Sequence, residues 1–180
     1  QLLERDILQP LKMTNSGVSP DRRAAKRMAQ GHNAAGEQMP RWEFKALAGA
    51  GAMYSTARDL LRFLGAYLNV KGMPSLPELA ETITPRRDGP GKVVKVCLGW
   101  MILSAYGKTL VFHDGGTGGF RSFLGFCPQD KLGVVLLSNS SVDVSDLGLH
   151  LLARQFPLRK VRKEIELPRE RLMAYTGRYQ

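Results

Sequence analysis

The chain has 180 residues, of which 43% are hydrophobic and 23% charged, and its formal net charge is +10. This length and composition predict one globular domain with a substantial core. No stretch approaches the roughly 18 consecutive apolar residues that a membrane-spanning helix requires, and the partly acidic opening residues do not resemble a signal peptide. Because the sequence does not begin with Met, we expect it to start inside a longer chain.

Half of the net charge lies near the C-terminus, where residues 154–178 hold eight Lys or Arg and three Asp or Glu. This stretch lacks the interleaved aromatic residues and recognition motifs that are typical of nucleic-acid-binding proteins. We therefore expect a solvated basic linker and no nucleic-acid partner. The competing hypothesis is DNA binding by this tail, which predicts a steep salt dependence that is lost when residues 158–180 are deleted.

The first half of the chain predicts two helices separated by an irregular segment. Leu and Ile recur at helical spacing over residues 2–8, and Pro10 ends that helix. Residues 15–44 are rich in turn-forming residues and predict a long loop, which is usually functional or packed as a lid. A second helix begins with a capping box of Thr56 and Asp59 and ends near Asn69 and Gly72. Five apolar residues are expected on one face of it: Leu60, Leu61, Leu64, Tyr67 and Leu68.

The second half predicts strands. After a loop over residues 73–92, with a short helical turn at 76–82, four β-branched or aromatic runs follow: 93–103, 109–113, 120–127 and 132–138. Tight turns at 106–108 and 129–131 make their flanking strands antiparallel neighbours. A last helix starts near Ser141 or Asp143 and stops at Pro157, with Val144, Leu147 and Leu151 on one face. This order predicts an α+β fold with an antiparallel β-sheet covered by helices.

Neither the cysteines nor the histidines predict a metal site, and no cofactor is expected. Cys97 and Cys127 lie in apolar runs without metal-ligand spacing, so we expect two buried thiols. The alternative is a disulfide between them. The histidines are scattered, and no H-E-x-x-H motif occurs. We expect His32 to form hydrogen bonds within a loop, and His150 to be structural or at the surface.

The most informative stretch is His-Asp-Gly-Gly-Thr-Gly-Gly-Phe at residues 113–120, between two predicted strands. Four glycines indicate that something closely approaches the backbone. One interpretation is a glycine-rich hairpin; the one we favour is a substrate site at a sheet edge, with backbone N–H groups facing a developing negative charge. His113 could donate to a substrate carboxylate or relay a proton. The alternative is a structural histidine that is bonded to Asp114 or to the backbone.

No nucleophile motif accompanies this stretch. The sequence contains no G-x-S-x-G elbow, and no serine is followed by lysine three positions later. The glycines also lack the spacing of a phosphate or dinucleotide loop. Tyr67 and Asn69 fit the pattern Y-x-N, but they lie at the end of an amphipathic helix, so we expect Tyr67 to belong to the core.

Five segments together resemble the C-terminal part of the catalytic domain of serine β-lactamase-like proteins, namely penicillin-binding proteins, class C β-lactamases and related esterases. They are ILQPLKMTNS (7–16), AGAGAMYSTARDLLRF (48–63), LGW (98–100), VFHDGGTGGF (111–120) and VVLLSN (134–139). The resemblance implies a partial β-lactamase/transpeptidase-like fold. It also implies a site built from an S-x-x-K helix, a Y-x-N loop and a K-T-G-type strand, in the periplasm or cell envelope.

In this resemblance His113, Asp114 and Gly115 take the K-T-G positions, with His in place of Lys. Gly116 would present its backbone N–H as half of the oxyanion hole, and the nucleophile's own N–H would be the other half. The neighbouring substrate-binding residues would be Asp114, Gly115, Thr117, Gly118 and Gly119, the last two leaving room for the substrate. The S-x-x-K and Y-x-N motifs are expected before Gln1, in a missing N-terminal part of the domain.

The resemblance also divides the chain. Residues 1–157 would be the C-terminal portion of the catalytic domain, and residues 158–180 a basic linker with the start of a small β domain at 175–179.

Lys12 replaces the glycine that is usual in the Pro-Leu-Gly-Met turn. Without strands from the missing part, the 132–138 strand or its neighbours are expected to have an unpaired edge.

Two functions remain open. The first is a fragment of a serine hydrolase that acts, in the complete protein, on a small-molecule or peptide substrate: a β-lactam, a D-amino peptide or an ester. Such a fragment would supply the oxyanion-hole wall and lack the nucleophile. The second is a non-catalytic binding or structural module on the same scaffold.

Overall fold

The computed structural model describes residues 2–160 and 167–177. The helical elements are η1 (Glu4–Leu8, a π-helix), α1 (Arg22–Arg27), η2 (Lys45–Ala50), α2 (Ala57–Tyr67), α3 (Leu79–Thr82), η3 (Pro90–Lys92), α4 (Ser145–Leu152) and α5 (Arg169–Met173). The strands are β1 (Gly31–His32), β2 (Gln38–Met39), β3 (Arg87–Asp88), β4 (Val94–Val96), β5 (Met101–Ala105), β6 (Lys108–Thr117), β7 (Phe120–Cys127) and β8 (Leu132–Ser138).

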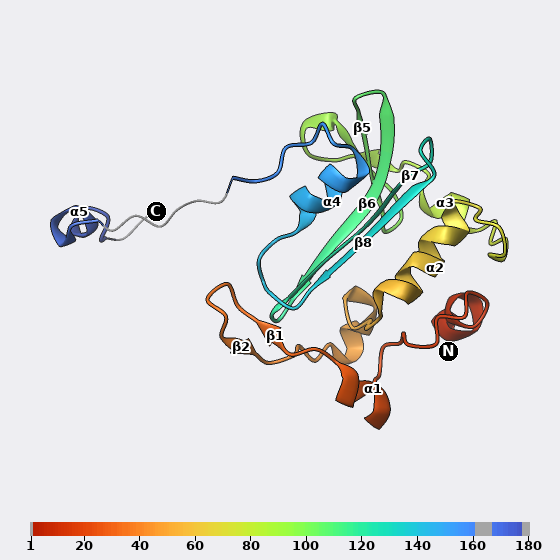
Figure 1. Cartoon of the computed structure of the whole chain (residues 1–180), viewed down its shortest axis with the longest axis horizontal. Helices are drawn as coiled ribbons and strands as arrows, with labels where there is room; N and C mark the ends of the chain where they lie inside the picture. Colours follow the sequence, from red (N-terminus) through yellow and green to blue (C-terminus); the bar gives the residue numbers. More distant parts are fainter. Residues whose placement is uncertain (1, 161–166, 178–180) are drawn as a thin grey trace.

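The centre of the molecule is a sheet of β3 to β8 in sequence order, in which every neighbouring pair is antiparallel. Helix α4 lies over one face of this sheet and α2 over the other (Figure 1). The predicted α+β fold, an antiparallel sheet covered by helices, is confirmed. The four predicted strands become six, because β3 adds an edge strand and the predicted run over 93–103 is two strands. A turn at Gly99, whose φ is +80°, separates β4 from β5.

Residues on β6 alternate between two cores, as the period of two in a strand requires. Leu110 and Phe112 pack on the α4 side with Phe123, Cys127 and Leu152. Val111 packs on the α2 side, with Leu64, Trp100 and Phe126. Because both faces of β6 are buried up to Phe112, its position within the molecule is fixed before the glycine-rich residues begin.

Tyr67 belongs to the core on the α2 side, as expected from its place in an amphipathic helix. Its hydroxyl accepts a hydrogen bond of 2.9 Å from Trp100 Nε1 and lies 2.7 Å from Thr82 Oγ1. Its ring packs against Phe63, Trp100 and Phe126 at centroid distances of 5.1–5.3 Å. Tyr67 therefore has a packing role, and the match of residues 67–69 to Y-x-N is coincidental.

Helix α2 has half of the predicted capping box. Thr56 Oγ1 accepts from the backbone N–H of Asp59 at 3.2 Å. The Asp59 carboxylate, 1% exposed, accepts instead from the backbone N–H of Asn15 at 2.7 Å and from Ser16 Oγ at 2.9 Å. The carboxylate therefore attaches the 15–16 segment to the start of α2. Leu61, predicted on the apolar face, is 49% exposed on the outer side of the helix.

The segment predicted as a long loop contains short elements. Asp21 caps α1 by accepting from the backbone N–H of Ala24 at 2.6 Å, and β1 pairs with β2. The prediction of a helical turn within 76–82 is confirmed by α3. Lys12 has a φ of +54°, in the left-handed region. This conformation explains why glycine suits the position, since a side chain there costs about 1 kcal/mol.

The cysteines and two of the histidines have structural roles. Cys97 and Cys127 are free and buried, so the prediction of two buried thiols is confirmed and no disulfide joins them. Burial raises the pKa of the Cys97 thiol, which keeps it protonated, although Arg86 acts in the opposite direction. His32 Nδ1 lies 3.2 Å from the carbonyl of Asn139, and His150 Nδ1 lies 2.7 Å from the carbonyl of Phe156.

At the C-terminus the described residues include α5, and Tyr175 is 67% exposed. Residues 178 and 179 of the segment proposed to open a β domain lie outside the described residues, as do residues 161–166 of the basic linker. Within the described ranges, no helix is long and apolar enough to cross a membrane.

Strand β8 ends the sheet, and between Leu132 and Ser138 no described strand pairs with its outer edge. Leu137, 48% exposed, lies on this strand. An open apolar edge favours pairing with another strand, so we expect the isolated chain to self-associate. Analytical ultracentrifugation should detect dimers or larger species, and Leu137→Lys should reduce them through charge repulsion at the edge. Val93→Lys, at a 64% exposed residue outside the strand, is the matched control. A monodisperse monomer that unfolds cooperatively would contradict this expectation.

Candidate functional site

The candidate site lies along the far half of β6. Strand β5 pairs with β6 only up to the Met101–Phe112 pair, whereas β7 pairs with it up to Thr117. In the part of the chain that the structure describes, no strand pairs with the β5 side of residues 113–117. The glycine-rich stretch is therefore mostly strand: β6 continues through Gly115 and Gly116, where the sequence suggested a loop, because β7 pairs with it throughout.

The register decides which backbone groups face this open edge. Thr117 and Phe120 flank a two-residue turn and pair directly, so they exchange both backbone hydrogen bonds. Along β6, every second residue forms such backbone hydrogen bonds with β7. Gly115 and His113 form them, and Gly116 and Asp114 do not. The backbone N–H and C=O of Asp114 and Gly116 consequently point to the open edge. An N–H at Gly116 in this direction can stabilise a developing oxyanion.

His113 is exposed and lies one residue past the last pair with β5, on the face of the sheet that α2 covers. Its ring has no hydrogen-bond partner among the described residues. This differs from His32 and His150, which both contact backbone carbonyls. The alternative of a structural histidine bonded to Asp114 or to the backbone therefore finds no contact in the structure, and the imidazole is free to meet a ligand.

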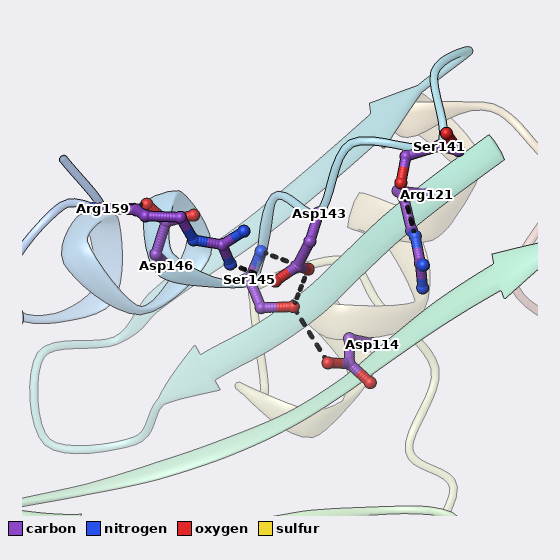
Figure 2. Close-up of polar contacts among 7 residues, drawn as sticks. All are labelled: Asp114, Arg121, Ser141, Asp143, Ser145, Asp146 and Arg159. Atoms are coloured by element: carbon purple, nitrogen blue, oxygen red, sulfur yellow. Dashed lines mark hydrogen bonds and ion pairs between the residues drawn. The ribbon is translucent and has the colours of Figure 1, made fainter. Parts of the chain in front are cut away.

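Asp114 is held from the opposite face of the sheet. Ser145, the first residue of α4, places its Oγ 2.9 Å from Asp114 Oδ2 and 2.7 Å from Asp143 Oδ1 (Figure 2). Arg159 donates to Asp143 Oδ2 at 2.6 Å and, through its backbone N–H, to Asp146 Oδ2 at 2.7 Å. The start of α4 and the residues after it thus fix the side chain of the second K-T-G-type position.

Electrostatics around Asp143 favour its charged form. Hydrogen bonds from Ser145 and Arg159 hold the pKa of this carboxyl below its ordinary value, against a smaller opposing effect of burial. The Ser145 hydroxyl has a single proton, so it donates to one of its two carboxylate neighbours at a time. Asp114 and Asp143 therefore share the Ser145 hydroxyl, while Arg159 forms an ion pair with Asp143.

A cation lies beside Gly116. Arg121 is its partner on β7, and Arg121 Nε donates to the carbonyl of Ser141 at 3.0 Å (Figure 2). A Cβ on Gly116 would meet the guanidinium, with Arg121 Cζ 2.9 Å away. The missing side chain at Gly116 therefore lets the guanidinium lie against the strand, next to the backbone N–H that faces the open edge.

The turn at Gly118 and Gly119 is occupied by the chain itself. A Cβ at Gly119 would lie 2.6 Å from the carbonyl carbon of Gly31, and one at Gly118 would lie 2.9–3.0 Å from the ring of Trp42. His32 N–H donates to the carbonyls of Gly119 and Asn139 at 3.1 and 2.9 Å. The close approach that these two glycines allow is therefore to the 31–42 segment, not to open space. The other predicted site residues, 113–117, lie on the open edge.

Sequence reasoning missed three contributors to this site. Ser145 follows the glycines after two intervening strands, Arg121 lies on β7 just after the turn, and Trp42, 59% exposed, comes from the segment predicted as a loop. Only Arg121 had a usable signal, because counting outward from a turn at 118–119 pairs it with Gly116. The described residues contain no group of three or more His, Cys, Asp or Glu that could hold a metal ion.

The fold defines the class of protein. A class C β-lactamase superposes with a TM-score of 0.74 at 18% identity over 88% of this chain and 52% of its own. The octameric penicillin-binding protein homologue from Pyrococcus abyssi superposes with a TM-score of 0.70 at 24% identity over 85% and 36%. At these identities the likeness concerns the fold: this is a β-lactamase-like fold, as the sequence predicted.

The sequence comparisons identify the family. The Beta-lactamase family profile matches residues 1–155. A human beta-lactamase-like 1 protein is 31% identical over 141 residues, which are 75% of this chain and 28% of that protein. D-alanyl-D-alanine-carboxypeptidase/endopeptidase AmpH of Escherichia coli K12 is 26% identical over 154 residues, 78% of this chain and 39% of AmpH. The chain belongs to the beta-lactamase family of serine hydrolases, and it spans only about a third of the length of these relatives.

Proposed function

We propose that this chain supplies the K-T-G-type wall of a serine hydrolase site for acyl transfer to water, while the nucleophile comes from polypeptide outside these 180 residues. The observation that carries the proposal is the open edge of β6. There the Gly116 backbone N–H and the nearby imidazole of His113 have no partner among the described residues. An acyl compound lying along residues 113–117 would place its carbonyl oxygen at that N–H.

In the proposed reaction a serine Oγ attacks the acyl carbon while its proton passes to the lysine of the S-x-x-K motif, and the carbonyl electron pair moves onto the oxygen. Gly116 N–H and the nucleophile's own N–H stabilise this oxyanion. The intermediate collapses to an acyl-enzyme as the leaving nitrogen or oxygen takes a proton, and water then releases the acid. His113 donates to the substrate or relays this proton. Asp114, Gly115 and Thr117 contact the substrate, while Gly118 and Gly119 keep the turn against the 31–42 segment.

Several wider assignments belong to this proposal. Residues 1–157 form part of the catalytic domain, and residues 158–180 form a basic linker and the start of a further β domain. The partner of the β6 edge is the part of the catalytic domain that carries S-x-x-K and Y-x-N. The substrate is a β-lactam, a D-amino peptide or an ester. Enzymes for these three substrates share one chemistry and differ in the shape of the loops around the site. The D-amino peptide option has the additional support of AmpH, a relative named as a D-alanyl-D-alanine carboxypeptidase/endopeptidase.

The isolated chain should not turn over acyl substrates, because no serine in it is followed by lysine three positions later. Incubation with a chromogenic β-lactam and with a nitrophenyl ester should give rates equal to those of buffer. Intact-mass spectrometry should detect no acyl adduct. A serine-linked acyl-enzyme with turnover would contradict the proposed lack of a nucleophile. An S-x-x-K and a Y-x-N upstream of Gln1 in the coding sequence would support the enzyme.

In a polypeptide that also contains the nucleophile, Gly116→Pro removes the proposed oxyanion donor and should reduce kcat by about a hundredfold or more. His113→Ala should also reduce activity, and His113→Lys should restore much of it if a donor is what this position requires. His150→Ala, away from the edge, is the control for histidine loss. Unchanged activity in Gly116→Pro would overturn the assignment of the edge.

A second candidate is a non-catalytic binding or structural module. It is favoured by the core position of Tyr67, whose hydroxyl is bonded within the core, so that the only literal Y-x-N of these 180 residues has no free hydroxyl. A start codon close to Gln1 would favour the module, and so would tight binding of an acyl ligand without turnover when the full polypeptide is present.

A further inference from the structure

The outer face of α2 carries a groove that the proposed hydrolase site does not use. It consists of two adjoining hollows of about 380 and 530 Å³, which have Arg62 and Met73 in common. The first extends towards Pro10 and Lys12, and the second runs along the helix past Arg58 and Leu61. The groove lies on the side of α2 that faces away from the sheet.

The floor of this groove is apolar. Leu61 and Val70 line it and are 49% and 50% exposed, and Met73 lies between the two hollows. Gly65 shapes it, because a Cβ there would be 3.1 Å from Met73 Cγ. A glycine inside a helix is less favourable than an alanine. Here it allows the segment after the helix to lie close against α2.

Three cations surround the floor: Lys12, Arg58 and Arg62. None of their side chains has a hydrogen bond or ion pair to another described residue, and no Asp or Glu lines either hollow. The adjacent Asp59 is buried on the other side of the helix, where it is bonded to the 15–16 segment. Arg62 is half-buried and still has no anionic partner within residues 2–160 and 167–177.

This arrangement does not stabilise the isolated fold. Arg58 and Arg62 are four residues apart on one helical stripe, and like charges at that spacing destabilise a helix. Leu61, between them, exposes apolar surface that its helix could have buried. A ligand with carboxylates beside apolar groups would relieve both features.

The shape and charge of the groove decide between occupants. A free anion would leave the apolar floor uncovered, and a flat membrane surface would not fill the two hollows. A second copy of this chain docked groove to groove would bring two sets of these three cations together. We propose that the groove binds an acidic amphipathic segment of another polypeptide, with its apolar side chains in the two hollows and its carboxylates on Lys12, Arg58 and Arg62.

Selection from a phage-displayed library of random 16-residue peptides tests this proposal without presuming a partner. Peptides enriched on the protein should carry Asp or Glu beside apolar residues spaced three or four apart. In fluorescence anisotropy with a synthetic copy of an enriched peptide, R58E/R62E should weaken binding at least tenfold. R22E/R23E changes the net charge equally at exposed residues of α1, outside the groove, and should weaken binding less than twofold.

Circular dichroism of both variants shows whether they are folded, and R58Q/R62Q, which adds no carboxylates, replaces R58E/R62E if that variant unfolds. Equal loss of binding in the groove and control variants would show that net charge alone causes the effect, and it would overturn the proposal. A selection without groove-dependent acidic peptides would also overturn it. So would binding to phosphatidylglycerol vesicles that depends on Arg58 and Arg62 while no enriched peptide competes. Catalytic activity does not enter these outcomes, so they are independent of the proposed hydrolase function.

Discussion

Replacing Asp59 with alanine should lower the free energy of unfolding by about 3 kcal/mol, since a hydrogen bond to a charged group contributes about 1.5–3 kcal/mol. The carboxylate is 1% exposed and accepts from Asn15 N–H and Ser16 Oγ. Its loss leaves both donors without this acceptor and releases the 15–16 segment from α2. Urea denaturation followed by far-UV circular dichroism measures the change.

Two variants make this prediction specific. Asp59→Asn keeps the shape and one acceptor, so it should cost less than Asp59→Ala. Asp21→Ala removes a carboxylate that caps α1 at the surface and should cost about 1 kcal/mol. If Asp59→Ala were no more destabilising than Asp21→Ala, the buried carboxylate would not be what joins the 15–16 segment to α2.

The second large effect is expected at the turn of the β6–β7 hairpin. Gly119→Ala should destabilise the protein by about 2–4 kcal/mol, which combines left-handed backbone strain with overpacking. Gly119 has a φ of +76°, and its Cβ would lie 2.6 Å from the carbonyl carbon of Gly31 and 2.5 Å from the backbone nitrogen of His32. These neighbours are backbone atoms, so no side-chain rotation relieves the clash.

The matched control is Gly36→Ala. Gly36 has a φ of +85°, and no atom lies within 4 Å of its Cβ position, so this variant carries the backbone strain alone, about 1 kcal/mol. Thermal unfolding compares the two, and amide hydrogen exchange should become faster at residues 113–117 in Gly119→Ala only. Equal destabilisation in the two variants would show that contact between the turn and the 31–32 segment contributes nothing.

Local patterns in the sequence predicted most of the elements. Thr56 and the leucines that follow it located α2, and the β-branched and aromatic runs located β6 to β8, because periodicity and capping are local properties of the chain. The errors of the sequence-based prediction also have physical causes. Gly115 and Gly116 have a low strand propensity, so the sequence predicted that the strand ends at His113. Pairing with β7 extends it by four residues, because a ladder of backbone hydrogen bonds outweighs propensity.

The candidate site, too, could be predicted from the sequence only in part. The residues of the K-T-G-type strand could be named from the sequence, since their order and spacing resemble a known family. The direction of each backbone group could not, because it depends on the turn position and on where β5 stops. The roles of Ser145 and Arg121 depend on contacts between elements 20 or more residues apart.

By itself, the sequence determined the α+β class, the principal helices and strands, the family and the stretch of chemical interest. Each of these is expressed in residue types at short spacings. The tertiary structure decided that residues 113–117 form an open strand edge and that Gly118 and Gly119 pack against the chain's own 31–42 segment. It also decided that a groove on α2 is surrounded by three cations that have no anionic partner among the described residues. Those facts arise from register and packing between distant segments, which local residue patterns do not encode.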